Sequence, residues 1–103
     1  MLVLTLLIST GSVVHVFADN SGYYGDNNSL RWNDAVRYFP YKSTWMNAWD
    51  PSERSTIERQ AKACLGTNCY VSEWERGSKY ASAYIDYTNG TGRAYTYRWW
   101  RYR

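Results

Sequence analysis

Histidine and cysteine are scarce in this chain of 103 residues, which contains one His and two Cys. The histidine, His15, lies in an N-terminal segment that we expect to be removed. The remaining chain then has neither a Ser-His nor a Cys-His nucleophile, and it lacks a histidine general base. Two cysteines without a histidine are also too few ligands for an ordinary metal site. The sequence therefore predicts a protein that is not an enzyme and holds no metal or cofactor.

The chain also lacks length and long apolar runs. A chain this short excludes a multidomain protein and a doubly wound nucleotide-binding fold. A membrane-spanning helix would need about 20 consecutive apolar residues. Aromatic residues, by contrast, are abundant, with six Trp, eleven Tyr and two Phe, and twelve Lys or Arg outnumber nine Asp or Glu. Because disordered chains are poor in aromatic residues, this composition predicts a small, folded, cationic protein.

The N-terminal segment, residues 1–18, has the pattern of a signal peptide. Residues 2–8 form an apolar run, and Val16 and Ala18 place small residues at positions −3 and −1 of a cleavage site before Asp19. The alternative is a membrane anchor, but the apolar run is short and is interrupted by Ser, Thr and Gly. We therefore expect a secreted, extracellular protein without a transmembrane span after cleavage.

The secreted part is expected to be a single small domain over residues 19–103, with a flexible start at 19–29 that is rich in Gly, Asn, Asp and Ser. An oxidising compartment favours a disulfide between Cys64 and Cys69. The loop that this bond closes is short, so we expect a local clip. A metal or redox pair is the competing interpretation, and it lacks further ligands.

Residues 50–65 have the pattern of a capped helix. The sequence Asp-Pro-Ser-Glu at 50–53 supplies a capping carboxylate, a proline at the first helical position and an acid in the first turn. Apolar residues then recur at helical spacing at Ile57, Ala61, Cys64 and Leu65. We predict a helix over about 51–65. Residues 30–49 show no single period, although Trp45 and Trp49, four residues apart, suggest a helical turn.

The rest of the chain has β patterning. Turn sequences at 76–79 and 88–91 predict a C-terminal three-stranded antiparallel meander on which the helix packs, an α+β fold with one local disulfide. One face of this meander would carry Tyr80, Tyr84, Tyr95, Tyr97 and Trp99. Such a face suits sugars, whose C–H faces stack on aromatic rings. The alternative is that residues 30–49 cover this face and that the tyrosines are part of the core.

The C-terminal tail, residues 93–103, combines four arginines with five aromatic residues and has no acid. Such segments favour anionic membrane interfaces and phosphate groups, because guanidinium pairs with phosphate and aromatic rings lie at the interface. An ordinary final strand with alternating Arg and aromatic residues would give a similar pattern. Nucleic acid is not an expected partner, since strand binding needs a stronger positive field.

One stretch resembles a known family. Gly-Ser-Lys-Tyr-Ala-Ser-Ala at 77–83, followed by Asn-Gly-Thr-Gly-Arg at 89–93, is similar to part of the lactococcin family of secreted, non-lanthionine bacteriocins. Members are small, exported, cationic β-proteins rich in Tyr and Trp. The resemblance implies growth inhibition through the cell-wall precursor lipid II.

These observations favour a secreted antimicrobial or bacteriocin-like protein that binds the bacterial envelope, either anionic lipid or a cell-wall precursor. One alternative is a carbohydrate-binding module or surface adhesin whose partner is a glycan. A further alternative is a secreted inhibitor that binds another protein. The candidate binding residues are Tyr80, Tyr84, Arg93, Tyr95, Tyr97, Arg98, Trp99, Trp100, Arg101 and Arg103.

Overall fold

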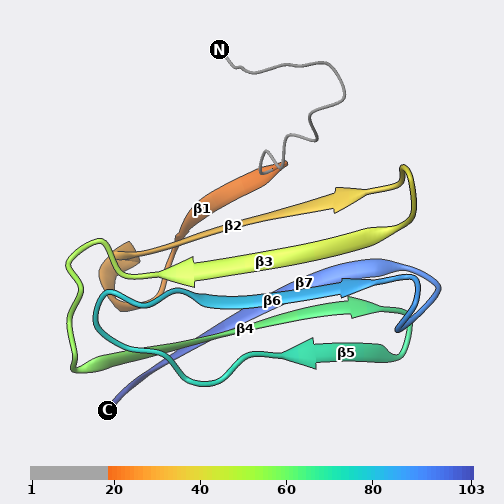
Figure 1. Ribbon diagram of the computed structural model, residues 1–103. Helices are drawn as coiled ribbons and strands as arrows, with labels where there is room; N and C mark the ends of the chain where they lie inside the picture. The colour runs from red at the N-terminus through yellow and green to blue at the C-terminus, as the bar shows by residue number, and fades with distance from the viewer. Residues whose placement is uncertain (1–18) are drawn as a thin grey trace.

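The computed structural model describes residues 19–103, which form seven β-strands and one short 3-10 helix (Figure 1). The predicted signal peptide lies outside the described residues. The elements are β1 (Asn20–Tyr24), η1 (Asp26–Asn28), β2 (Leu30–Arg37), β3 (Ser43–Trp49), β4 (Ile57–Leu65), β5 (Asn68–Val71), β6 (Ala81–Asp86) and β7 (Ala94–Tyr102). Every strand pairing is antiparallel. Four strands form sheet A in the order β1-β2-β3-β6, and three form sheet B in the order β5-β4-β7.

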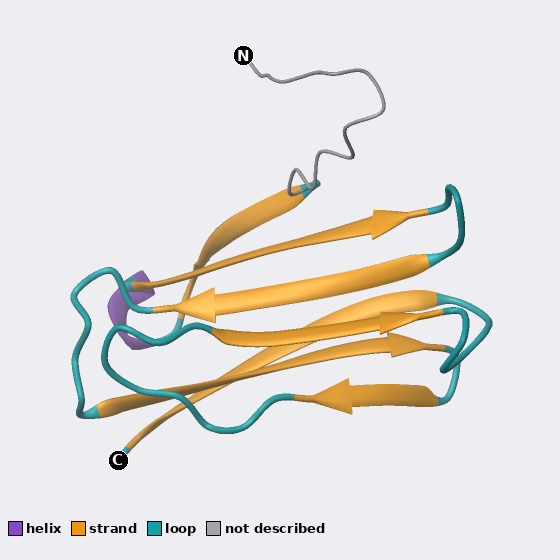
Figure 2. Ribbon diagram, viewed as in Figure 1, coloured by secondary structure: helices purple, strands orange, loops and turns teal. Residues whose placement is uncertain are grey.

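The two sheets pack face to face, with β4 against β3 and β6 and with β7 against β3 (Figure 2). Along each strand, alternate side chains point into the space between the sheets. The buried core is built mainly from small residues. It consists of Met46, Ala48, Ala61, Ala63, Leu65, Ala81, Ala83 and Ile85. Because these side chains are small, most of the large aromatic rings lie outside this core.

The predicted helix over 51–65 is wrong. The carboxylate of Asp50 does cap backbone donors, accepting hydrogen bonds from the N–H groups of Ser52 at 2.9 Å and Arg54 at 3.2 Å. It caps a turn, however, because Glu53 has a φ of 54° and takes the chain out of the helical conformation. The chain then enters β4, which is a strand from Ile57 onward.

Two periods fit the apolar residues of this segment, which explains the error. Ile57, Ala61 and Leu65 are four residues apart, a spacing that suits one face of a helix and also one face of a strand. Ala63 lies on the same inward face and is buried, as a strand requires. Arg59 also points inward and is fully buried. Because Arg59 is charged, the sequence of β4 does not show the alternation of apolar and polar residues that identifies a strand.

The predicted three-stranded meander is also wrong. The two turns are present, since the N–H of Lys79 donates to the carbonyl of Arg76 at 3.4 Å and that of Asn89 to Asp86 at 2.9 Å. The strands that they connect lie in different sheets: β5 and β7 both pair with β4, whereas β6 pairs with β3. This arrangement lets the apolar rows of two sheets bury each other, so no helix is needed to cover the sheet.

The segment expected to be a flexible start contains ordered structure. Strand β1 pairs along its whole length with β2. Asp19, just before it, accepts a hydrogen bond from the N–H of Val36 at 2.8 Å and one from the guanidinium of Arg37 at 3.0 Å. Pairing with β2, the next strand along the chain, therefore orders residues that are rich in turn formers.

The predicted disulfide between Cys64 and Cys69 is confirmed, and it joins β4 to β5. The two cysteines are five positions apart in sequence, so the bond restricts the unfolded chain only slightly. We expect its reduction to lower the free energy of unfolding by about 2 kcal/mol. Urea denaturation of the oxidised and the reduced protein measures this difference. An unchanged denaturation midpoint after reduction would contradict the expected contribution.

Candidate functional site

The outer face of sheet A alternates aromatic and polar rows of side chains. In one row Trp45 of β3 lies directly opposite Tyr84 of β6. In the next row along the strands, Asn47 of β3 lies between Asn33 of β2 and Ser82 of β6. The row after that is again aromatic. A polar row is thus flanked on both sides by aromatic rings.

The second aromatic row is formed by Trp49 and Tyr80, whose rings stack with centroids 4.9 Å apart and an interplanar angle of 26°. Tyr80 precedes β6, and Trp49 ends β3. Rows two residues apart on a strand are separated by roughly 7 Å, so the two aromatic rows lie roughly 13 Å apart. This distance gives an extended ligand two places to stack.

The polar row is connected by hydrogen bonds. The hydroxyl of Ser82 donates to Oδ1 of Asn47 at 2.6 Å, and Nδ2 of Asn47 donates to Oδ1 of Asn33 at 3.1 Å. An amide nitrogen carries two donor hydrogens, so Asn47 and Asn33 retain N–H groups that can reach a ligand. The row therefore offers amide donors in fixed orientations.

A hollow of about 480 Å³ opens over the edge of β6, and we call it the sheet A hollow. Its lining consists of Trp45, Asn47, Tyr70, Ser82, Ala83 and Tyr84. Tyr70 reaches it from β5 of the other sheet. None of the lining residues is an acid or a base, so the hollow suits a neutral, polar ligand. Burial raises the pKa of Tyr84, and a hydrogen bond with Tyr41 raises it further, so this phenol stays neutral at physiological pH.

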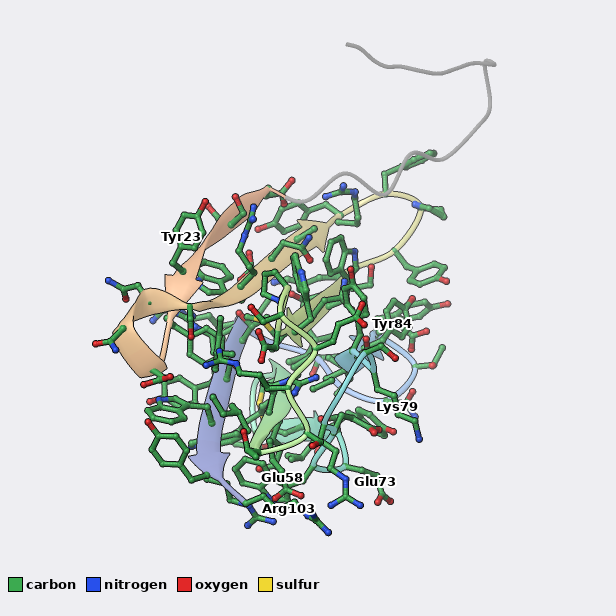
Figure 3. The ribbon with its side chains drawn as sticks, turned by 90° about the vertical axis from the view of Figure 1, so that its left-hand side faces the viewer. Tyr23, Glu58, Glu73, Lys79, Tyr84 and Arg103 are labelled. Carbon is green, nitrogen blue, oxygen red and sulfur yellow. A yellow bond between two sulfur atoms is a disulfide. The ribbon has the colours of Figure 1, made fainter. Side chains whose placement is uncertain are left out.

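The structure brings only two of the predicted binding residues to this face. Tyr80 and Tyr84 lie on sheet A, whereas Tyr95, Tyr97 and Trp99 lie on the outer face of sheet B. In that sheet these three residues are opposite Cys64, Lys62 and Gln60, respectively. Both layers of the sandwich separate the two groups, so the single aromatic platform that the meander predicted does not form. Figure 3 shows Tyr84 at a distance from Glu58 and Arg103, which lie near the end of β7.

The outer face of sheet B has a cationic and aromatic character of its own. The ammonium group of Lys62 lies 5.8 Å from the ring centre of Tyr95 and 5.9 Å from that of Trp99. Both distances are within the range of cation–π attraction. Tyr97 packs edge-on against Trp99 with centroids 5.0 Å apart. Tyr95 and Trp99 therefore already have a cation from the same chain as a partner.

The predicted arginine cluster of the tail is not a cluster in space. Arg98 points between the sheets, where its guanidinium lies 4.0 Å from the ring centre of Trp32. Arg101 donates to the carboxylate of Glu58 at 2.8 Å and lies 3.9 Å from the ring centre of Trp74. Intramolecular contacts therefore occupy both of these arginines.

The remaining tail residues are separated by the length of the strand. Arg93 and Arg103 are exposed but flank β7 at opposite ends, roughly 30 Å apart for an extended chain. Trp100 lies on the inward side of β7, where its ring would contact a side chain placed at Gly25. The arginines of the tail are close together in sequence, but the strand places them on two faces and at two ends.

Four residues of the candidate site were not among the predicted binding residues: Trp45, Asn47, Asn33 and Tyr70. The signal was the alternation of β3, whose odd-numbered residues point outward and whose even-numbered residues are buried. The spacing of Trp45 and Trp49 fits that alternation as well as it fits a helical turn. Chemistry alone would not have linked Tyr70 to β6, because the two come together only when the sheets stack.

The described residues hold no group of three or more His, Cys, Asp or Glu side chains placed to bind a metal ion. Between residues 19 and 103 there is also no helix of the length and apolar character needed to cross a membrane. Comparison of the chain with protein-family models, with curated proteins and with solved structures found no match.

Proposed function

We propose that this protein is a secreted, non-catalytic antibacterial protein that binds a saccharide component of the bacterial envelope. The observation that carries the proposal is the outer face of sheet A, where Trp45 and Tyr84 lie side by side next to the amide row of Asn47. Aromatic rings stack on the C–H faces of sugars, and amides hydrogen-bond sugar hydroxyls. A hollow of about 480 Å³ has the size of an ordinary small-ligand site.

A neutral saccharide suits the sheet A hollow better than a phosphate does. Its lining has no cation, whereas phosphate sites rely on Arg, Lys or converging backbone N–H groups. The arginines that the sequence suggested for phosphate binding are far apart or already occupied by Glu58, Trp74 and Trp32. The site therefore supports stacking and hydrogen bonding as the source of affinity.

The antibacterial part of the proposal is supported by the resemblance of residues 77–93 to the lactococcin family and by the predicted signal peptide at 1–18. A carbohydrate-binding module or adhesin would use the same hollow and would bind the same saccharides. Growth inhibition distinguishes the two functions, since a module binds cells without arresting their growth.

The test measures binding of residues 19–103 to soluble cell-wall saccharide fragments by calorimetry. Trp45→Ala removes a stacking ring and is expected to weaken binding about tenfold, whereas Trp45→Phe keeps a ring and much of the affinity. Tyr97→Ala, on the outer face of sheet B, is the matched control and should leave binding unchanged. Because the interaction is not ionic, the affinity should change little between low and high salt.

Growth of Gram-positive indicator cells with the same variants tests the antibacterial step. Inhibition by the wild-type protein should be lost in Trp45→Ala and kept in Tyr97→Ala. Saccharide binding that is unaffected by Trp45→Ala would overturn the assignment of the site. Saccharide binding without growth inhibition would point to the module instead.

A further inference from the structure

The turn between β2 and β3, residues 38–42, presents the two most exposed large hydrophobic side chains that the structure describes. Phe39 is 87% exposed and Tyr38 is 73% exposed. The Phe39 ring has no polar atom that could hydrogen-bond to water. A largely exposed apolar ring at a turn is a feature of surfaces that contact a partner.

This turn is held in place by the loop between β6 and β7. The ammonium group of Lys42 donates to the carbonyl of Gly92 at 2.7 Å, and the N–H of Tyr87 donates to the carbonyl of Lys42 at 2.9 Å. The rings of Tyr41 and Tyr87 pack with centroids 5.0 Å apart. Both connections lie at the same end of the sandwich (Figure 1). We call Tyr38, Phe39, Tyr41 and Tyr87 the aromatic tip.

The charges around the aromatic tip are positive. Residues 38–42 and 87–93 contain Lys42 and Arg93 but no acid. The nearest carboxylates, Asp19 and Asp86, lie at the bases of the connections and accept hydrogen bonds there, from the guanidinium of Arg37 at 3.0 Å and the N–H of Thr88 at 3.1 Å respectively. A cationic rim around apolar and phenolic rings complements a surface that is both apolar and anionic.

We infer that the aromatic tip docks on the interface of an anionic phospholipid bilayer. The phenyl ring of Phe39 would enter the boundary between acyl chains and headgroups, while the hydroxyls of Tyr38 and Tyr41 stay among the headgroups. Arg93 has a long side chain that keeps its charge at the phosphate level. Lys42, whose ammonium group donates to the carbonyl of Gly92, adds a second positive charge at the tip. A convex tip of this kind suits a deformable lipid surface better than a second copy of the chain, which would need a matching cavity.

This inference extends the proposed function, since lipid is a second component of the same envelope, but it rests on different residues. A small hollow of about 260 Å³ lies between the tip and the sheet A hollow, and Phe39 and Tyr41 line it together with Trp45 and Tyr84. Docking of the tip would therefore hold the sheet A hollow beside the membrane surface. Saccharides attached to membrane lipids would then be within its reach.

The test is co-sedimentation of residues 19–103 with vesicles of phosphatidylcholine and phosphatidylglycerol, compared with vesicles of phosphatidylcholine alone. The wild-type protein should bind the anionic vesicles more strongly, and added salt should weaken that binding. The double variant Tyr38→Ser and Phe39→Ser is expected to bind the anionic vesicles at least about tenfold more weakly, because the apolar ring that enters the bilayer is gone. Tyr23→Ser, on the outer face of sheet A and 61% exposed, is the matched control and should bind like the wild type.

The two proposals fail separately. Trp45→Ala should weaken binding to soluble saccharide about tenfold and keep binding to vesicles. Tyr38→Ser changes a residue that lines neither hollow and should keep binding to saccharide. Vesicle binding that survives the double tip variant, or that is equal for neutral and anionic lipid, would overturn the docking of the tip. Circular dichroism shows whether each variant is folded before binding is measured.

Discussion

Replacing Arg59 with methionine is expected to lower the free energy of unfolding by about 3–5 kcal/mol. Arg59 is fully buried between the sheets. Its guanidinium donates to the carbonyl of Ile57 at 2.7 Å and to the carbonyls of Gly77 and Lys79 at 2.9 and 2.7 Å. Methionine would fill much of the volume but would leave three carbonyl oxygens without this donor.

The geometry explains why this charge is tolerated in the interior. The carbonyls of Gly77 and Lys79 belong to the connection between β5 and β6, so Arg59 fixes that connection to β4. Burial lowers the pKa of Arg59, while the nearby Asp50 acts in the opposite direction. The connection leads directly into Tyr80, which stacks on Trp49. Loss of Arg59 should therefore also loosen one aromatic row of the candidate site.

Urea denaturation followed by far-UV circular dichroism measures the effect. Arg59→Lys, which keeps a charge but loses the planar fork, should give an intermediate loss. Arg101→Met is the matched control, because Arg101 is half-exposed on the outer face of sheet B and its ion pair with Glu58 contributes little. Equal midpoints for Arg59→Met and the wild type would mean that water replaces the guanidinium at these carbonyls.

Local features of the fold could be predicted from the sequence, while the pairing of strands could not. The disulfide followed from two cysteines five residues apart and an expected oxidising compartment. Both turns, at 76–79 and 88–91, followed from turn-forming residues. Which strand lies next to which depends on contacts between residues far apart in sequence, such as Cys64 opposite Tyr95. Turn chemistry and hydrophobic period set the register of a strand once its partner is known, but they do not identify the partner.

The helix prediction failed at a charged core residue. Asp50 was predicted to cap that helix, and its side chain does accept backbone N–H groups, but those groups belong to a turn. A buried Arg59 broke the alternation that would have identified β4, and the remaining apolar residues fitted a helix equally well. A sequence pattern treats arginine as a surface residue, whereas the structure satisfies it with three carbonyls in the interior.

The candidate site was predicted only in part for a related reason. Tyr80 and Tyr84 were identified as stacking residues, and both lie on the outer face of sheet A. Their partners Trp45 and Trp49 come from β3, which pairs with β6 across a long stretch of sequence. The arginines of the tail were predicted to form one phosphate-binding cluster because they are close together in sequence. An extended strand, however, places alternate residues on opposite faces.

Replacing Asp50 with alanine is the second change for which we expect a large loss of stability, about 3 kcal/mol. Asp50 is 2% exposed, and Nε of Arg54 donates to its carboxylate at 2.7 Å. Arg54 also donates to Asp26 at 3.1 Å and to the hydroxyl of Ser29 at 2.7 Å. One carboxylate therefore organises the connection between β3 and β4 and, through Arg54, ties it to the start of β2.

The same carboxylate makes the stability depend on pH. Burial acts to raise the pKa of Asp50. Hydrogen bonds from the Arg54 side chain and the Ser52 backbone lower it, and together the lowering effects are the larger, so the net pKa lies below its ordinary value of 3.8. A carboxyl with a lower pKa in the folded state contributes stability that is complete above its unfolded pKa and is lost as the pH falls through the folded value. The wild-type protein should therefore lose this contribution in acid below about pH 4.

Denaturation midpoints of the wild type, Asp50→Ala and Asp50→Asn between neutral pH and strong acid separate these effects. The difference between wild type and Asp50→Ala should be largest near neutral pH and should shrink in acid, because the wild type loses the same interaction on protonation. Asn keeps an acceptor for the Ser52 N–H, so Asp50→Asn should recover part of the neutral-pH loss. A difference that stays constant with pH would show that Asp50 stabilises the turn by its shape alone and that its charge contributes nothing.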